Sequence, residues 1–113
     1  MAKIRVLVVD DSVVARRVIS GIISTHPGCE VVGAAASGSI ALQKIPQINP
    51  DLITMDLDMP GMDGVQTVAE IRKTYKEIPI IMVSSLTEAG AAVTLRALSA
   101  GASDYVTKAS MPL

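Results

Sequence analysis

Five short apolar runs alternate with amphipathic helical segments along this chain of 113 residues. Each run is too short to cross a membrane as a helix, but it is long enough to form a strand buried on both faces. Such an alternation is typical of a parallel sheet covered by helices. The predicted strands comprise residues 4–9, 30–35, 52–56, 78–83 and 104–107.

Four helices are predicted between these strands, from cap residues and from apolar side chains spaced by three or four positions. The second should end at Pro46, because proline has no N–H to donate inside a helix. The fourth should end at Gly101, a residue type that is common just after a helix. The expected starts are Ser12, Ser37, Gly64 and the pair Thr87-Glu88.

We expect one α/β domain over residues 1–113, built as a flavodoxin-like, doubly wound, five-stranded parallel sheet. The expected strand order is 2-1-3-4-5, which places strands one, three and four side by side. Their carboxyl ends, and that of strand five, then meet at one edge of the sheet. In sheets of this kind, ligands bind outside the carboxyl ends of the strands.

Composition excludes several function classes. The formal net charge is −1, so there is no electrostatic reason to expect nucleic acid or an anionic membrane as a partner. The first apolar stretch ends at two acids after a few residues, so it predicts neither a signal peptide nor a membrane span. Cys29 is the single cysteine, which rules out an intramolecular disulfide and favours the cytoplasm.

Acidic residues gather where the predicted strands end. The stretch DLITMDLDMPGMDG at 51–64 delivers Asp56 to the end of strand three, and Asp10-Asp11 follow strand one. Ser84 and Lys108 follow strands four and five. A single aspartate at a strand end is usually a turn former, but polar residues from four strand ends that converge on one edge indicate a site.

Carboxylates crowded at one edge repel one another, and a hard divalent cation relieves that repulsion. We expect Mg²⁺ or Mn²⁺, bound by the carboxylates of Asp11 and Asp56 and by the backbone carbonyl of Asp58, with Asp10 a direct or water-mediated ligand. The Asp56 carboxylate could attack phosphorus to form an acyl phosphate. The Lys108 ammonium and the Ser84 hydroxyl could stabilise the transferred group.

Two other functions are compatible with these residues. A metal-dependent phosphatase could use Asp56 as nucleophile and Asp58 as acid, although Asp10-Asp11 are then less well explained. An interaction domain that is never phosphorylated is the third possibility. A calcium loop starting at Asp56 is excluded, because Thr67 stands where a bidentate glutamate is needed.

Four motifs resemble the receiver domain of two-component response regulators: VVDDS at 8–12, MDLDMPGMDG at 55–64, the hydroxyl after strand four, and YVTK at 105–108. The resemblance implies that Asp56 is the phosphoacceptor and that a histidine kinase donates the phosphoryl group. It implies that Asp10 and Asp11 are the acid pair for the metal, and that Lys108 is the lysine of the family pattern. It also makes Ser84 and Tyr105 the switch pair.

The stretch VSSLTEAGAAVTLRALSAGASDYVTKAS at 83–110 is similar to the receiver domain of chemotaxis protein-glutamate methylesterases. This narrower resemblance implies a carboxyl-terminal output domain that demethylates or deamidates chemoreceptors. The receiver domain alone would catalyse only its own phosphorylation and dephosphorylation. The receiver of another response regulator, transcriptional or stand-alone, is the alternative.

Two departures from the family pattern carry further expectations. Ala109 follows Lys108 where the pattern usually has proline, so we expect a trans peptide there. A full receiver also has a fifth helix after the last strand, which is missing or truncated in this chain. The face left bare should make the 113-residue form self-associate.

Overall fold

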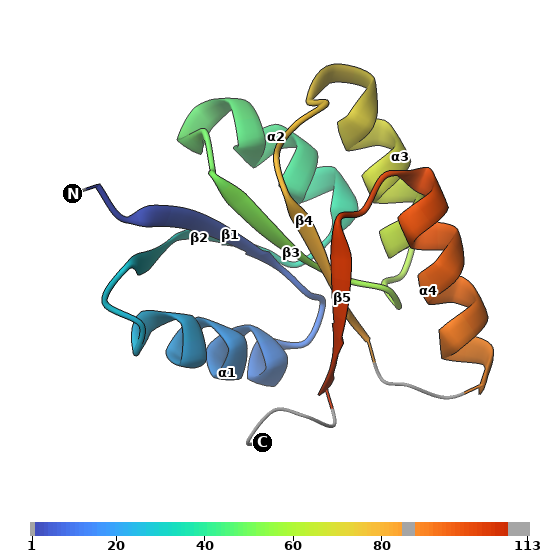
Figure 1. The fold of residues 1–113 in the computed structure, drawn as a ribbon, viewed down its shortest axis with the longest axis horizontal. Helices are drawn as coiled ribbons and strands as arrows, with labels where there is room; N and C mark the ends of the chain where they lie inside the picture. Colours follow the sequence, from blue (N-terminus) through green and yellow to red (C-terminus); the bar gives the residue numbers. More distant parts are fainter. Residues whose placement is uncertain (1, 85–87, 109–113) are drawn as a thin grey trace.

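A computed structural model of the chain describes residues 2–84 and 88–108 (Figure 1). Its five strands are all parallel and follow the order β2-β1-β3-β4-β5, which confirms the predicted topology. The elements in chain order are β1 Ile4–Val9, α1 Val13–Ser24, β2 Cys29–Ala35, α2 Gly38–Ile48, β3 Leu52–Asp56, α3 Gly64–Thr74, β4 Ile80–Ser84, α4 Glu88–Ala100 and β5 Asp104–Thr107.

Strand β1 lies inside the sheet and supplies side chains to two separate cores. Leu7 and Val9 point to one face and pack in the larger core, with residues of α2, α3 and α4. Val6 and Val8 point to the other face and pack against Ala15 and Ile19 of α1. This two-sided burial explains why the strand is a continuous apolar run, and each buried side chain contributes about 1.5–3 kcal/mol.

The helices cover the two faces of the sheet unequally. Within residues 2–84 and 88–108, α1 is the one helix on its face of the sheet, whereas α2, α3 and α4 lie on the other face (Figure 1).

Within residues 2–84 and 88–108, no helix is long and apolar enough to cross a membrane.

The predicted end of α2 at Pro46 is wrong, because the helix continues to Ile48. The lost N–H leaves the carbonyl of Leu42 without its helical donor, but packing outweighs that cost. Ala41 and Ile45 are fully buried on the same face, and Ile48 extends it against the core. The helix instead ends at Asn49, whose left-handed φ of 47° lets its N–H donate to the Ile45 carbonyl at 2.9 Å.

Two predicted strand starts also need correction. Strand β4 begins at Ile80 rather than at residue 78, because Pro79 has no N–H and Ile78 packs half-buried beside the core. Strand β2 begins one residue earlier than predicted, at Cys29, which pairs with Ile4.

The predicted cap Thr87 and the Lys108–Ala109 peptide lie outside the described residues.

The predicted end of α4 at Gly101 is confirmed. Gly101 has a φ of +122°, and the next N–H, of Ala102, donates back to the Ala97 carbonyl at 3.0 Å. Arg72 of α3 fixes this turn from outside, since its Nε donates to the Gly101 carbonyl at 2.8 Å and its stem lies where a β-carbon would stand.

An apolar groove of about 180 Å³ runs along the face that α1 covers only in part. The hydroxyl of Thr54 is buried in its floor and has no hydrogen-bond partner among the described residues. The predicted self-association would use this groove, and it stays a prediction. Side chains of α1, β3, β4 and β5 line it: Ile19, Ile22, Ile23, Thr54, Ile81, Val83 and Val106.

Replacement of Gly21 should stabilise the domain. Gly21 lies inside α1, is exposed, and has no atom within 4 Å of the position that a β-carbon would take. Gly21→Ala should therefore raise the free energy of unfolding by about 0.5–1 kcal/mol, measured by urea titration. Gly64→Ala is the contrasting variant, because its β-carbon would collide with the Asp56 carbonyl. A destabilised Gly21→Ala protein would contradict this reading of α1.

Candidate functional site

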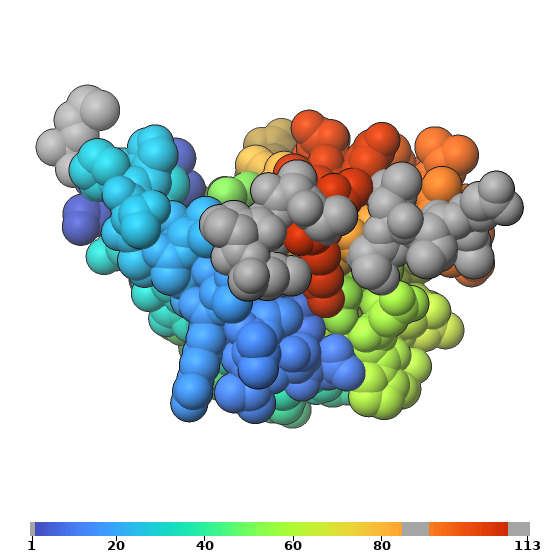
Figure 2. Space-filling model, turned by 90° about the horizontal axis from the view of Figure 1, so that it is seen from below, coloured from blue at the N-terminus to red at the C-terminus, as the bar shows by residue number. Residues whose placement is uncertain are grey.

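The polar ends of β1, β3, β4 and β5 meet at the carboxyl edge of the sheet, as predicted. Seen from below, the blue start of α1, the red end of β5 and the yellow-green segment after β3 lie next to one another (Figure 2). Asp10 follows β1, Asp56 ends β3, Ser84 ends β4 and Lys108 follows β5. The parallel register places Asp56 opposite Val83, one residue before Ser84.

Three carboxylates form the acidic part of the site. Oxygen atoms of Asp10, Asp11 and Asp56 all lie within 4.8 Å of one another, although Asp10 and Asp56 are buried and Asp11 is exposed. Ligand oxygens around Mg²⁺ lie ~2.9 Å apart when adjacent and ~4.1 Å apart when opposite. All three groups offer carboxylate oxygens, so the donor set has the right chemistry for a hard divalent cation.

Asp10 is held in place by contacts on nearly all its polar atoms. Its N–H donates to the Ala35 carbonyl at 3.0 Å, and its Oδ1 accepts the Ser12 N–H at 2.9 Å. Its own carbonyl accepts a hydrogen bond from Arg16 Nη1 at 2.7 Å. A fully buried carboxylate needs such partners, because an unpaired charge in a core is costly.

Lys108 supplies the positive charge of the site. Its Nζ lies 3.1 Å from Asp10 Oδ2 and 3.3 Å from Asp56 Oδ1, so it bridges two buried acids. The ammonium thus stands where it would face a group bound to Asp56.

Burial raises the pKa of Asp56 to about 6, and repulsion from Asp10 adds to that shift. Lys108 lowers the same pKa but offsets only part of the rise. Burial by itself would lower the pKa of Lys108, but its contacts with Asp10 and Asp56 outweigh this and leave that pKa above the usual value. Asp56 is therefore mostly ionised at pH 7.

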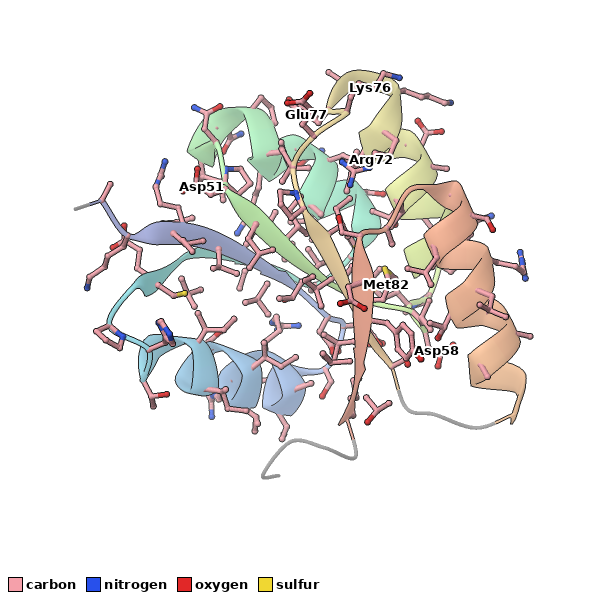
Figure 3. All side chains as sticks on the ribbon, in the orientation of Figure 1. Asp51, Asp58, Arg72, Lys76, Glu77 and Met82 are labelled. Carbon is pink, nitrogen blue, oxygen red and sulfur yellow. The ribbon has the colours of Figure 1, made fainter. Side chains whose placement is uncertain are left out.

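Asp58 does not join the three carboxylates. It lies beyond the carboxyl end of β3, at the opposite end of the strand from Asp51, and its side chain is exposed (Figure 3). The arrangement gives no support to Asp58 as the acid of a phosphatase pair. The prediction that its backbone carbonyl is a metal ligand stays a prediction.

The two hydroxyl-bearing residues of the predicted switch are in different environments. Ser84 is 2 % exposed, and its hydroxyl has no hydrogen-bond partner among the described residues. Tyr105 is 42 % exposed, and it lines an apolar hollow of about 200 Å³ with Ala91, Thr94 and Leu95 of α4. The hydroxyl is thus available to a new acceptor, and the ring lies outward beside α4.

Two further residues, Arg16 and Gly64, shape the site although the sequence does not predict either as a site residue. Arg16 lies off the apolar stripe of α1, a position typical of solvent exposure, yet it is half-buried and its Nη1 donates to the Asp10 carbonyl. Gly64 is predicted only as a helix start, yet it has no room for a side chain against the backbone of Asp56 and Leu57. The sequence offers one signal for this need: Gly64 directly follows the helix cap Asp63, at the point where α3 begins beside the end of β3.

The sequence model described as "Response regulator receiver domain" matches residues 6–112. The chain belongs to this family. The resemblance found in the four motifs is thereby confirmed, and the receiver fold explains why the acids and the lysine meet at one edge.

Two similar proteins carry names from chemotaxis. This receiver domain is 56 % identical, over 96 % of its length, to a protein-glutamate methylesterase/protein-glutamine glutaminase of Trichodesmium erythraeum, 31 % of which it covers. The response regulator domain of Thermotoga maritima CheB is 46 % identical, with a TM-score of 0.87 over 98 % of this chain and 82 % of that one. The receiver domain spans about a third of the length of the curated relatives it matches.

A third relative was solved with ligands. CheY of Borrelia burgdorferi, in a complex with CheX, BeF3 and Mg²⁺, is 31 % identical to this receiver domain. The TM-score is 0.84, and the match covers 99 % of this chain and 81 % of that one.

Asp56→Asn should change how the stability of the metal-free domain depends on pH. The folded pKa of about 6 lies above the ordinary value of 3.8, so between these values only the folded state holds the proton. The free energy of unfolding should then fall as pH rises from about 4 to 6, by up to about 3 kcal/mol. Asp56→Asn should remove most of that fall and be more stable than wild type at pH 7.

Urea titrations at several pH values, in the presence of a chelator, measure this effect. Asp58→Asn is the matched control, because it removes an exposed acid nearby and should keep the wild-type slope. If the free energy of unfolding depended on pH equally in wild type and Asp56→Asn, the raised pKa would not belong to the Asp56 carboxylate.

Proposed function

We propose that this receiver domain accepts a phosphoryl group on Asp56 from a histidine kinase and thereby controls an output domain. The observation that carries the proposal is the meeting of three carboxylates with Lys108 at the carboxyl edge, in a chain of the receiver family. The BeF3 and Mg²⁺ named for the Borrelia CheY complex support the same chemistry.

In the proposed transfer, an Asp56 carboxylate oxygen attacks the phosphorus of a phosphohistidine. The new bond joins that oxygen to phosphorus, the phosphorus–nitrogen bond breaks, and the imidazole leaves with the electron pair and takes up a proton. The product is an acyl phosphate on Asp56. Lys108, already 3.3 Å from Asp56 Oδ1, would hold the phosphoryl oxygens by charge.

Mg²⁺, or Mn²⁺ with its similar preference for oxygen, would be held by Asp10, Asp11, Asp56 and the carbonyl of Asp58. When bound, it would neutralise charge on the transferred group. The role of this chain is to bring Asp10, Asp11 and Asp56 together before the ion arrives. Lys108 balances part of their charge in the meantime.

We propose that Ser84 and Tyr105 read the phosphorylated state. The Ser84 hydroxyl would donate to a phosphoryl oxygen, and the movement would open space beside α4 for the Tyr105 ring. The unpartnered hydroxyl of Ser84 and the outward ring of Tyr105 support this order of events. Phosphorylation would thus favour one of two states of the α4–β5 edge.

The proposed output is a domain of the methylesterase and glutaminase type that two relatives carry in their names. These relatives are about three times as long as the chain, which leaves room for such a domain after the receiver. A cytoplasmic location fits both a kinase partner and a chain with one cysteine.

Phosphorylation of Asp56 is tested by intact mass after incubation with acetyl phosphate and Mg²⁺. Wild type should gain one phosphoryl group and Asp56→Asn none. Lys108→Ala should slow the reaction about 100-fold, the usual cost of losing one group that stabilises developing charge. Lys76→Ala is the control, since it removes an exposed lysine that lies just beyond the carboxyl end of α3 (Figure 3). A labelled Asp56→Asn protein would refute the assignment.

The readout is tested by NMR with beryllofluoride and Mg²⁺. Amide shifts along α4 and β5 should change in wild type, change much less in Ser84→Ala, and change as in wild type in Ser84→Thr, which keeps the hydroxyl. Ligand binding itself should persist in Ser84→Ala. Equal changes along α4 in wild type and Ser84→Ala would remove Ser84 from the mechanism.

A further inference from the structure

The two acids that follow β1 are held in different ways. Asp10 is fully buried, and both oxygens of its carboxylate face a donor, Ser12 N–H on one side and Lys108 Nζ on the other. Asp11 is exposed, and within residues 2–84 and 88–108 no hydrogen bond or ion pair holds its side chain. The direction of the Asp11 carboxylate therefore depends on its backbone.

That backbone is fixed by Arg16. The carbonyl of Asp10, which accepts Arg16 Nη1 at 2.7 Å, belongs to the planar peptide unit that joins Asp10 to Asp11. Holding this oxygen sets the orientation of the whole unit, including the nitrogen from which Asp11 begins. A hydrogen bond from a charged donor is also stronger than one between neutral groups.

Arg16 is itself anchored by the packing of α1. Its neighbour Ala15 and the next buried residue, Ile19, lie in the core on the α1 face of the sheet. Arg16 is half-buried and pairs with no carboxylate among the described residues, so its contact at the site is with the backbone.

We propose that Arg16 is a positioning residue that orients Asp11 toward Asp10 and Asp56 and so prepares the site for a divalent cation. This inference rests on the proposed function, because it assigns Asp11 to cation binding. It adds a residue that acts through the peptide between the two acids and does not touch the ion.

Whether Arg16→Ala weakens or tightens cation binding distinguishes a positioning role of Arg16 from a simple effect of its charge. A guanidinium near a cation site repels the cation, so loss of its charge alone would tighten binding. Loss of a positioning contact would weaken binding, as is usual when groups that orient metal ligands are removed. Arg16→Ala should therefore bind the cation more weakly, against the direction that charge predicts.

Calorimetric titration with Mn²⁺ and with Mg²⁺ measures the effect. Arg16→Ala should bind about 10-fold more weakly than wild type. Arg16→Lys, which keeps the charge and one donor, should lie between the two. Arg17→Ala is the matched control, because Arg17 is the next residue of α1, has the same charge, is exposed, and should leave affinity within about twofold.

A second measurement needs no metal. The NMR order parameter of the Asp11 amide in the metal-free domain should fall in Arg16→Ala and stay at the wild-type value in Arg17→Ala. Urea titration of each variant shows whether the fold is intact, and Arg16→Lys carries the test if Arg16→Ala does not fold.

Cation binding by Arg16→Ala that equals or exceeds that of Arg17→Ala would overturn the proposal, as would an unchanged order parameter at Asp11. Failure of wild type to bind Mn²⁺ or Mg²⁺ at all would instead refute the proposed cation site. The order parameter at Asp11 would still decide whether Arg16 holds that residue.

Discussion

Two carboxylates buried side by side, with one ammonium group between them, are the constraint on which the rest of this domain depends. Asp10 and Asp56 are almost entirely removed from water, so their repulsion is weakly screened. Burial raises the pKa of Asp56, repulsion from Asp10 adds to the rise, and Lys108 offsets only part of it. The remaining electrostatic cost must be balanced by packing elsewhere, and the two strands that lead to these acids, β1 and β3, are each buried over their last four residues.

The fold could be predicted because its information is local and periodic. Buried strands are short apolar runs, and helices show their caps and their apolar face in the sequence. Errors arose where packing outweighed a local rule. Pro46 lacks a donor, yet α2 passes through it because Ile45 and Ile48 both face the core. Ile78 looks like part of a strand, yet it packs outside the ladder that begins at Ile80.

The main groups of the site were predictable for a topological reason. Parallel strands share one carboxyl edge, so Asp10, Asp56 and Lys108 had to approach one another once the strand order was known. The supporting groups were not predictable in the same way. Arg16 binds a backbone carbonyl, which has no sequence signature, and its reach depends on how α1 lies on the sheet. The need for a glycine at Gly64 depends on the approach of α3 to β3.

The buried acids and the lysine of this site follow strands that differ in how completely they are buried. Asp10 follows β1, which is packed on both faces, whereas Lys108 follows β5, an edge strand whose first three residues are exposed. Lys108 and a divalent cation would draw on the same carboxylates. Thermodynamic linkage then requires that occupation of the site weaken the attachment of this edge, and that a looser edge favour occupation. The hold of Lys108 on this edge strand would thus depend on a competition between two positive charges for the same acids.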